Sequence, residues 1–466
     1  MTSKGCAFLM DMGTGKTITT IALAGTLHHK HKITQMLVVC PKSIVDVWEQ
    51  EFEKFADFPY QLAVLDGTSA KKADTIRYMI GNGLQIIVVN YESCWRLEAE
   101  LTRWHPDMIV CDESSKIKNP QAKCSKALHR LGKISSYNLI LTGTPITNSP
   151  LDFFSQYKFL DESIFGGSFY GFRAYYAILG GFQNHQIVVG GAGAHSGGHI
   201  GADVIHSAGG DGHDGYKHLA ELVEKAHSIA YRIRIDEAVD LPEFVEEVRP
   251  VKLEQNAQKI YDGIEKDSFA ELMNGEITTR NVLTQLLRLS QITGGFVRND
   301  DGDDAQQLST AKLDALEDVI DSCMEEGKKV IVFARFVPEI DAIARMLRKK
   351  NIGYALIKGD VKDRAEQVSA FQTDPDTKVF VGQLQTTGMG LTLTAGSVCV
   401  YYSLDFSYAN YQQSMARVRR IGQTKRGVYI HLVCKDTIDE KVMGALKQKA
   451  DVSKLLVDDY KKIIGG

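Results

Sequence analysis

The sequence has no apolar run approaching the roughly 18 residues that a membrane-spanning helix needs. Its first residues also lack the apolar core of a secretion signal peptide. The eight cysteines form no C-x-x-C pair, which is typical of buried apolar thiols in a reducing compartment rather than of disulfides or a zinc site. We therefore expect a cytoplasmic protein without a membrane partner.

The sequence also lacks a strong charge imbalance. The formal net charge is -4, with 24% charged and 44% hydrophobic residues, which is ordinary for a soluble globular protein. This charge balance neither indicates nor excludes nucleic-acid binding, because a local basic groove matters more for binding than the net charge of the whole chain. At 466 residues the chain is too long for one hydrophobic core, so we expect at least two lobes.

A glycine loop stands between an apolar run at 6–10 and a predicted helix at 18–27. The strand, loop and helix order is typical of a phosphate-binding loop, in which backbone N–H groups and the helix N-terminus face the phosphates. Lys16 would reach the outer phosphates, and the Thr17 hydroxyl would bind Mg²⁺. Position 10 is Met10 rather than the glycine of the full pattern, so a simple turn with a solvated lysine is the alternative. The predicted nucleotide contacts are Gly13, Thr14, Gly15, Lys16 and Thr17.

An acidic pair follows a predicted buried strand at 108–111. Ligands bind at the carboxyl edge of open parallel sheets. Asp112 would hold Mg²⁺, and Glu113 would orient and deprotonate the water that attacks the γ-phosphate. A solvated strand end is the alternative, but the phosphate loop upstream favours a hydrolytic site. Other predicted strands of this lobe lie at 36–40, 85–89 and 137–141.

Two further strand ends carry polar residues. Lys42 and Ser43 open a helix after the second strand and are candidates for a nucleic-acid backbone. Thr142, Gly143 and Thr144 stand at the end of the fifth strand. The threonine hydroxyls either transmit the state of the bound phosphate to a neighbouring surface or belong to a simple turn.

The middle of the chain has helical periodicity at 217–231, 255–271 and 281–292. Residues 190–215 are rich in glycine and histidine, and we expect a mobile loop there because so few apolar residues are available for burial. His195 and His199 stand four residues apart, as metal ligands on a helix would, but the surrounding glycines argue against a helix. The acidic run at 299–304 indicates a solvated loop.

Strand alternation returns from Lys312, with strands predicted at 330–334, 354–357, 379–381 and 398–402 and helices at 338–349 and 364–371. This second lobe has no phosphate loop, so it would serve the nucleotide of the first. Thr386 and Thr387 open a glycine loop that could approach a phosphate. The sequence places Gln413, Arg417 and Arg420 at helical spacings, which predicts one face with an amide and two guanidiniums. The two arginines would stabilise a transferring phosphoryl group, a solvated basic helix end being the alternative.

Several stretches together resemble superfamily two helicase-like ATPases, and within them the SWI/SNF-like branch of DNA translocases. In the first lobe these are "LMDMGTGKT", "LVVCPKSIVDVWEQEFEKF", "VCDESSKIKNP" and "LTGTPITN", and in the second "KVIVFARF", "TTGMGLTLTAG" and "QSMARVRRIGQTKRGVYIHLV". The resemblance implies an α/β fold of two RecA-like lobes with helical protrusions between them, ATP and Mg²⁺ as cofactors, and DNA as partner. It implies lobe 1 at residues 1–160, protrusions and linker at 161–310, and lobe 2 at 311–466.

The sequence departs from the family pattern at four positions. Ser114 and Ser115 stand where Ala-His is usual, Arg419 where His is common, and Thr392 where Asn is common. Family members also carry an upstream segment with a glutamine that reads adenine, and here few residues precede the first predicted strand. We therefore identify no adenine-reading residue in this sequence.

The leading hypothesis is a nucleic-acid-stimulated ATPase that moves along duplex DNA. A strand-separating DNA helicase, an RNA-dependent ATPase and a nucleotide-binding clamp without turnover are the alternatives. The compact form resembles phage and bacterial members, which implies a bacterial or phage-infected cell. We also expect a monomer.

Overall fold

The structure is a computed structural model that describes residues 4–180, 187–188, 215–273, 279–297, 305–359, 361, 363–388 and 391–459. These residues form two compact units. Unit 1 contains the described residues up to 188, residues 215–239 and residues 449–459, and unit 2 contains the described residues of 240–448. The predicted insertion at 190–215 and the acidic run at 299–304 lie outside the described residues, apart from Gly215.

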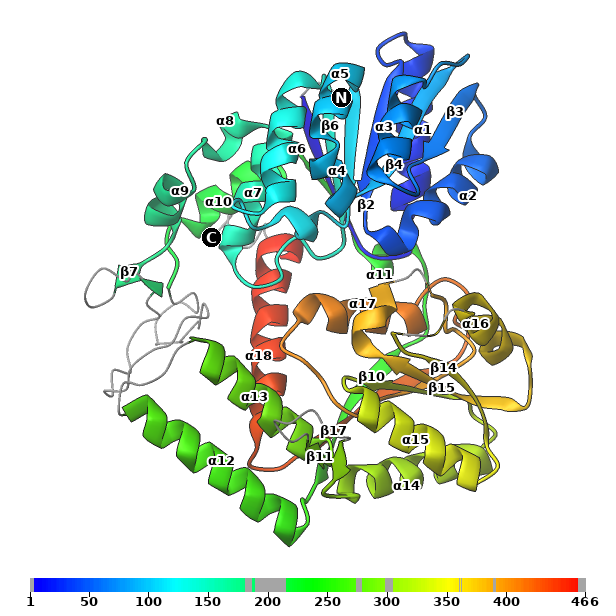
Figure 1. Ribbon diagram of the computed structural model, residues 1–466, viewed down its shortest axis with the longest axis vertical. Coiled ribbons are helices and arrows are strands. Elements are labelled where there is room, and N and C mark those ends of the chain that lie inside the picture. The colour runs from blue at the N-terminus through cyan, green and yellow to red at the C-terminus, as the bar shows by residue number, and fades with distance from the viewer. Residues whose placement is uncertain are drawn as a thin grey trace. The chain divides into compact units, whose positions relative to one another are not determined.

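Unit 1 is built on a seven-stranded parallel sheet with the order β3-β4-β2-β5-β6-β1-β9 (Figure 1). Five of these strands match the predicted ones to within one residue at each end. The strands are β1 (Gly5–Met10), β2 (Gln35–Cys40), β3 (Tyr60–Val64), β4 (Leu84–Asn90), β5 (Met108–Asp112), β6 (Tyr137–Thr142) and β9 (Ala230–Ile233).

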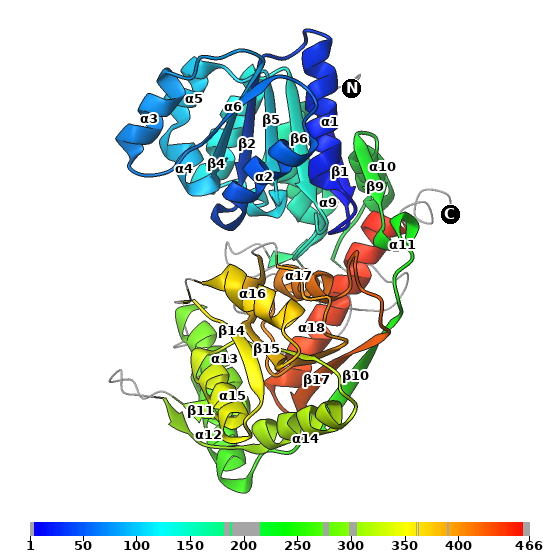
Figure 2. The ribbon, with the colours of Figure 1, turned by 90° about the vertical axis from the view of Figure 1, so that its right-hand side faces the viewer.

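Both faces of this sheet are buried under helices, as is typical of parallel sheets. Successive residues of β2 point to opposite faces: Val38 packs with α1 (Lys16–His29) and α2 (Val45–Phe55), and Val39 packs with the helices on the other side. Figure 2 shows α1 and α2 beside the sheet. The opposite face and its edge carry α3 (Ser69–Arg77), α4 (Tyr91–Arg96), α5 (Glu98–Trp104), α6 (Lys123–Ile134), α7 (Phe153–Leu160), α8 (Glu162–Phe165), α9 (Phe169–Tyr176) and α10 (Leu219–His227).

The predicted helix at 217–231 is wrong at its C-terminal end. Helix α10 ends at His227, and the chain then forms β9, which pairs in parallel with β1. The backbone of Ala7 donates to the carbonyl of Ile229 at 2.9 Å, so pairing at the sheet edge overrides the local helical pattern. A single helical turn, α11 (Ile235–Ala238), follows.

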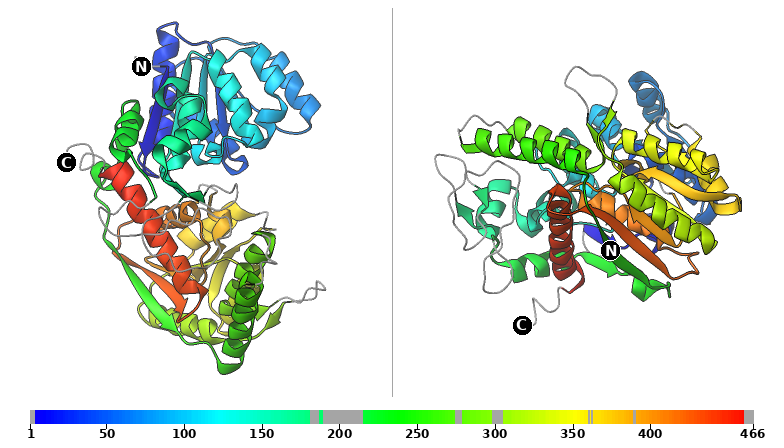
Figure 3. Two further views of the ribbon diagram at one scale, coloured as in Figure 1. Left: turned by 90° about the vertical axis from the view of Figure 1, so that its left-hand side faces the viewer. Right: turned by 90° about the horizontal axis from the view of Figure 1, so that it is seen from below.

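Unit 2 is built on a six-stranded parallel sheet with the order β10-β17-β16-β13-β15-β14. Figure 3 shows the long edge strand β10, in green, beside β17 in orange. Helices α14 (Ala311–Glu325) and α15 (Val337–Lys349) pack on the aliphatic face of the sheet. The opposite face is aromatic, with Phe333, Phe380 and Tyr401 in ring contact. The strands are β10 (Phe244–Val251), β13 (Val330–Ala334), β14 (Gly353–Ile357), β15 (Thr377–Gln383), β16 (Val398–Tyr401) and β17 (Gly427–Cys434).

The predicted helices of unit 2 are confirmed to within a few residues. The remaining elements are α12 (Gln255–Met273), α13 (Thr279–Thr293), α14 (Ala311–Glu325), α15 (Val337–Lys349), α16 (Arg364–Thr373), α17 (Tyr408–Val418) and α18 (Ile438–Ser453). Small antiparallel pairs join β7 (Leu179–Gly180) to β8 (Ile187–Val188) and β11 (Phe296–Val297) to β12 (Gln306–Gln307). The two helix-flanked parallel sheets confirm the predicted α/β class of two RecA-like lobes.

Candidate nucleotide and nucleic-acid sites

The glycine loop connects β1 directly to the N-terminus of α1. Gly13 and Gly15 have φ angles of 83° and 89°, a left-handed conformation that costs glycine little and other residues more. The Lys16 ammonium donates to the carbonyls of Met10 at 3.0 Å and Asp11 at 3.1 Å. Lys16 therefore folds back over its own loop, and these two bonds are what a phosphate oxygen would replace.

The threonine hydroxyls within the loop and near the start of α1 differ in their hydrogen bonding. Thr14 donates to the carbonyl of Asp11 at 2.8 Å, and Thr20 donates to that of Lys16 at 2.8 Å. Within the described residues Thr17 makes no such bond. Its hydroxyl oxygen is thus available to an external ligand at the helix N-terminus.

Asp112 ends β5 and is buried. Its Oδ2 accepts a hydrogen bond from the Trp48 indole at 3.0 Å, and its Oδ1 accepts one from the Glu113 backbone at 2.9 Å. Burial raises the pKa of Asp112 to about 7, the neighbouring Glu113 adds to this rise, and Lys16 opposes it. Such a carboxyl group releases its proton readily when a cation arrives.

Glu113 directly follows the strand in a left-handed conformation, with a φ of 53°. This conformation is costly for a residue with a side chain. Its Oε2 is buried and has no hydrogen-bond partner among the residues that the structure describes. A buried, unpartnered carboxylate oxygen is expensive unless a ligand or water supplies a donor. Glu113 is therefore suited to accept a proton from water at this edge of the sheet.

Ser114, which directly follows the acidic pair, is joined through Gln156 to the turn after β6. The Ser114 hydroxyl donates to Gln156 Oε1 at 2.7 Å, and Gln156 Nε2 donates to the carbonyls of Pro145 and Asp152 at 2.8 and 2.9 Å. Gly143 packs on the phosphate loop, because a Cβ built there would lie 3.3 Å from the carbonyl oxygen of Met10. Loop, acidic pair and turn therefore form one contiguous structure.

The predicted nucleic-acid contacts of unit 1 are accessible. Lys42 and Ser43 are exposed in a short 3-10 turn, η1 (Lys42–Ile44), between β2 and α2. Trp48 and Phe52 of α2 are buried. The helix thus fixes the position of these two polar residues after a buried strand.

In unit 2, Thr386 and Thr387 lie in a short turn, η4 (Leu384–Gly388), that follows β15. The Thr386 hydroxyl donates to the carbonyl of Gln383 at 2.7 Å. Both residues thus follow a parallel strand at its carboxyl end, the edge where ligands of open α/β sheets bind.

Helix α17 does not carry all three residues of the predicted polar face. Gln413 and Arg417 lie on it, but the helix ends at Val418, so Arg420 is beyond its C-terminus and the prediction of one helical face is wrong there. Arg420 Nη1 donates to the carbonyl of Leu391 at 3.2 Å and to the Thr392 hydroxyl at 3.1 Å. A tertiary contact rather than helical spacing therefore positions Arg420.

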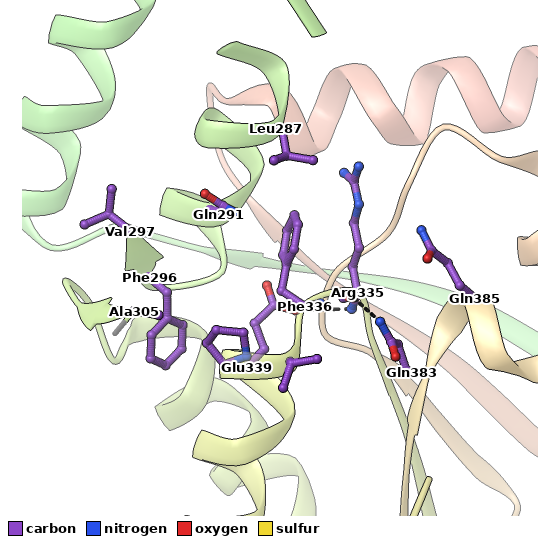
Figure 4. Close-up of a pocket in the computed structure, with 12 residues that line it drawn as sticks. Leu287, Gln291, Phe296, Val297, Ala305, Arg335, Phe336, Glu339, Gln383 and Gln385 are labelled. Carbon is purple, nitrogen blue, oxygen red and sulfur yellow. Dashed lines mark hydrogen bonds between the residues drawn. The ribbon is translucent and has the colours of Figure 1, made fainter. Parts of the chain in front are cut away.

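A pocket of about 270 Å³ lies at the ends of β13 and β15 in unit 2 (Figure 4). Its polar side chains include Arg335, Gln383 and Gln385, and its apolar wall includes Phe336 and Leu287. Burial lowers the pKa of Arg335. Arg335 and Phe336 follow β13, Gln383 ends the neighbouring strand β15, and Gln385 and Thr386 lie in the turn after it.

Sequence reasoning missed several of these residues. Arg335, Gln383 and Gln385 each end or follow a buried strand, which is a readable signal of the carboxyl edge of a parallel sheet. Trp48 and Gln156 carried no such signal, because their partners are distant in sequence. The described residues contain no group of three or more His, Cys, Asp or Glu side chains suited to a metal, and His195 and His199 lie outside them.

The chain matches the family model of the SNF2-related domain over residues 1–294 and that of the helicase conserved C-terminal domain over residues 311–422. The chain therefore belongs to the SNF2-related family. No helix within the described residues is long and apolar enough to cross a membrane.

Three curated relatives illustrate the match. An uncharacterized ATP-dependent helicase of Mycoplasma genitalium is 25% identical over 96% of this chain and 40% of its own length. The ISWI chromatin-remodeling complex ATPase ISW1 of Saccharomyces cerevisiae is 26% identical over 96% of this chain and 38% of its own length. The DNA repair and recombination protein RAD54-like of Gallus gallus is 26% identical over 99% of this chain and 65% of its own length. The chain thus spans about two fifths to two thirds of these relatives.

Among solved structures, the Sulfolobus solfataricus SWI2/SNF2 ATPase core in complex with dsDNA aligns with 99% of this chain and 92% of its own chain. Its TM-score is 0.41 and its sequence identity is 24%.

Proposed function

We propose that this chain is an ATP-hydrolysing motor that moves along duplex DNA. The observation that carries the proposal is the carboxyl edge of the unit 1 sheet. The phosphate loop follows β1 there, and the buried Asp112 and the unpartnered Glu113 oxygen stand at the end of β5, with only β6 between the two strands. Membership of the SNF2-related family supports ATP use. The names of the curated relatives, which include a DNA repair and recombination protein, support DNA as the partner.

In this proposal the loop binds the phosphates of ATP. Lys16 leaves the carbonyls of Met10 and Asp11 and turns to the outer phosphates, while Gln413 contacts the nucleotide. Backbone N–H groups from Gly13 to Thr17 face the phosphate oxygens at the N-terminus of α1.

The residues present fit a Mg²⁺ ion, because a free hydroxyl and a carboxylate are both oxygen donors. The Thr17 hydroxyl and the Asp112 carboxylate would hold it, Asp112 directly or through water. Bound Mg²⁺ neutralises charge on the phosphate oxygens. Asp112 would lose its proton when it binds the ion, and the hydrogen bond from Trp48 would keep the carboxylate oriented.

Glu113 is the proposed general base. Its carboxylate orients a water molecule and takes its proton as the water attacks the γ-phosphate. Arg417 and Arg420 are proposed to stabilise the negative charge of the transferring phosphoryl group.

The proposed nucleic-acid contacts use residues that follow strands in both units. Lys42 and Ser43 in unit 1 and Thr386 and Thr387 in unit 2 would bind backbone phosphates. Arg335, which follows the neighbouring strand β13, would add a positive charge at the same edge of the unit 2 sheet.

Phosphate release from ATP tests the proposal. It is measured without polynucleotide and with single-stranded DNA, duplex DNA and RNA, with Lys16→Ala as the blank. We expect release in the wild type that duplex DNA stimulates most. Greatest stimulation by RNA would instead identify an RNA-dependent ATPase, and no release with any polynucleotide would identify a clamp without turnover.

A further inference from the structure

Arg232 of β9 joins three distant parts of unit 1. Its Nη1 lies 2.7 Å from Asp11 Oδ1, and its Nη2 and Nε lie 2.5 and 2.8 Å from Asp458 Oδ1. The same Nη1 also donates to the carbonyl of Leu9 at 2.9 Å. The Arg232 side chain is 12% exposed. Largely desolvated pairs of this kind are costly to break, because the remaining partner keeps a buried charge.

Asp11 is the first residue of the phosphate loop, and its backbone and side chain are both held. Its N–H donates to the carbonyl of Ile233 at 3.0 Å, and its Oδ2 accepts from the backbone of Ile235 at 2.9 Å. Its own carbonyl accepts from Lys16 and Thr14. A displacement of Asp11 therefore moves the acceptor that sets the starting position of the Lys16 ammonium.

Asp458 belongs to a C-terminal segment that is firmly packed into unit 1. This segment is the π-helical turn η5 (Lys454–Asp458), in which Leu456 and Val457 are buried in the core of unit 1. The carbonyl of Leu456 lies 3.1 Å from Nε2 of His227. Burial raises the pKa of Asp458, and Arg232 opposes this rise.

The chain connectivity gives this cluster a further property. The chain leaves unit 1 after Val239, shortly beyond Arg232, and returns to it at Lys449 within α18, shortly before Asp458. Figure 1 draws α18 in red. The Arg232–Asp458 pair thus ties the outgoing and returning segments together at the phosphate loop.

We infer that Arg232 and Asp458 are positioning residues of the nucleotide site, and that the C-terminal segment 454–458 is part of its support. The inference rests on the proposed function in so far as it concerns ATP hydrolysis. Asp458 orients the Arg232 guanidinium, and Arg232 fixes the position of Asp11. Asp11 in turn positions the phosphate loop and the Lys16 ammonium. Movement of the returning segment therefore changes how tightly the loop binds the nucleotide.

The test compares Asp458→Asn with Asp458→Glu, which keeps the charge, and with Asp451→Asn, an exposed aspartate on α18. Binding of a fluorescent ATP analogue is titrated for each full-length protein, and KM and kcat for ATP are measured alongside. We expect Asp458→Asn to weaken binding and raise KM by about 3- to 30-fold, the range of coupling along contiguous networks. We expect Asp458→Glu to recover most of this loss and Asp451→Asn to match the wild type.

Unchanged analogue binding and KM in Asp458→Asn would overturn the inference. If that variant does not fold, Arg232→Lys is used for the same test, because a single ammonium group cannot reproduce the forked contacts of the guanidinium. Wild-type analogue binding by Arg232→Lys would also overturn the inference. A wild type that binds the analogue without releasing phosphate would contradict the proposed function alone, since the binding titration still compares the variants.

Discussion

The indole N–H of Trp48 donates to Asp112 Oδ2 at 3.0 Å, which links helix α2 to the carboxylate at the end of β5. The bond lowers the pKa of Asp112, against the rise that burial produces. Trp48 is itself buried, so water cannot readily replace its N–H. The tryptophan therefore helps to keep Asp112 charged and oriented for a cation.

We predict that Trp48→Phe weakens Mg²⁺-dependent ATP hydrolysis by about 10- to 100-fold, the usual effect of losing a partner that orients a metal ligand. The pKa of Asp112 rises without the bond, so the acid limb of the Mg²⁺ dependence moves to higher pH. The measurement is ATP turnover against Mg²⁺ concentration at several pH values. Trp104→Phe is the control, because the Trp104 indole N–H has no partner among the described residues. Equal Mg²⁺ dependence in both variants contradicts the prediction.

We predict that Ser114→Ala destabilises the protein by about 1–3 kcal/mol, because it leaves the buried Gln156 Oε1 without its donor. Urea-induced unfolding measures this loss. Ser115→Ala is the matched control, since Ser115 is less buried and makes no side-chain hydrogen bond within the described residues. Equal stability of the two variants argues against a structural role for the Ser114 hydroxyl.

We predict that Arg420→Ala lowers kcat for ATP by about 10³-fold or more, the magnitude expected for an arginine that stabilises a transferring phosphoryl group. ATP binding should change little, so the loss appears in kcat rather than in the affinity for a fluorescent analogue. Arg426→Ala removes an exposed arginine from the same region and should leave turnover unchanged. A kcat near the wild-type value in Arg420→Ala refutes the assignment.

We predict that Glu339 makes unit 2 less stable as the pH rises. Burial raises the pKa of this carboxyl group to about 7, although it accepts bonds from Ser403 and the Phe336 backbone. The folded state therefore holds its proton at pH values where the unfolded state has lost it, and the protonated form is favoured below about pH 7. Between pH 5 and pH 8 this group alone should lower the free energy of unfolding by about 2–3 kcal/mol.

Glu339→Gln tests this pH dependence, because the amide cannot ionise. The free energy of unfolding of the wild type, minus that of the variant, should fall between pH 5 and pH 8. A difference that is flat over this range would show that Glu339 titrates similarly in the folded and unfolded states.

The parallel sheets were the most predictable part of the fold. Apolar runs such as β2 and β5 are buried on both faces, and this burial leaves a continuous signal in the sequence. The edge strands β3 and β9 were not predicted, since Tyr60–Val64 is half-buried and Ala230–Ile233 follows directly on a helical pattern. Their structure depends on pairing with β4 and β1, which is non-local.

The candidate site was predictable where its residues directly follow strands. Asp112 ends β5 and Glu113 follows it, while Lys16 begins α1 after the loop that follows β1. Their supporting partners were not predictable, because Trp48 lies 64 residues from Asp112 and Arg232 lies 226 residues from Asp458. Arg420 shows the limit of spacing arguments, since the end of α17 separates it from Arg417.

We propose that ATP hydrolysis moves the chain along duplex DNA, and displacement of a third strand from a DNA triplex measures this movement directly. We predict displacement that requires ATP and is lost in Glu113→Gln, which still binds the nucleotide. A forked duplex is tested in parallel, and we expect neither protein to separate its strands. Unwinding of the fork by the wild type with the triplex left intact, or triplex displacement undiminished in Glu113→Gln, would contradict the proposed movement along duplex DNA.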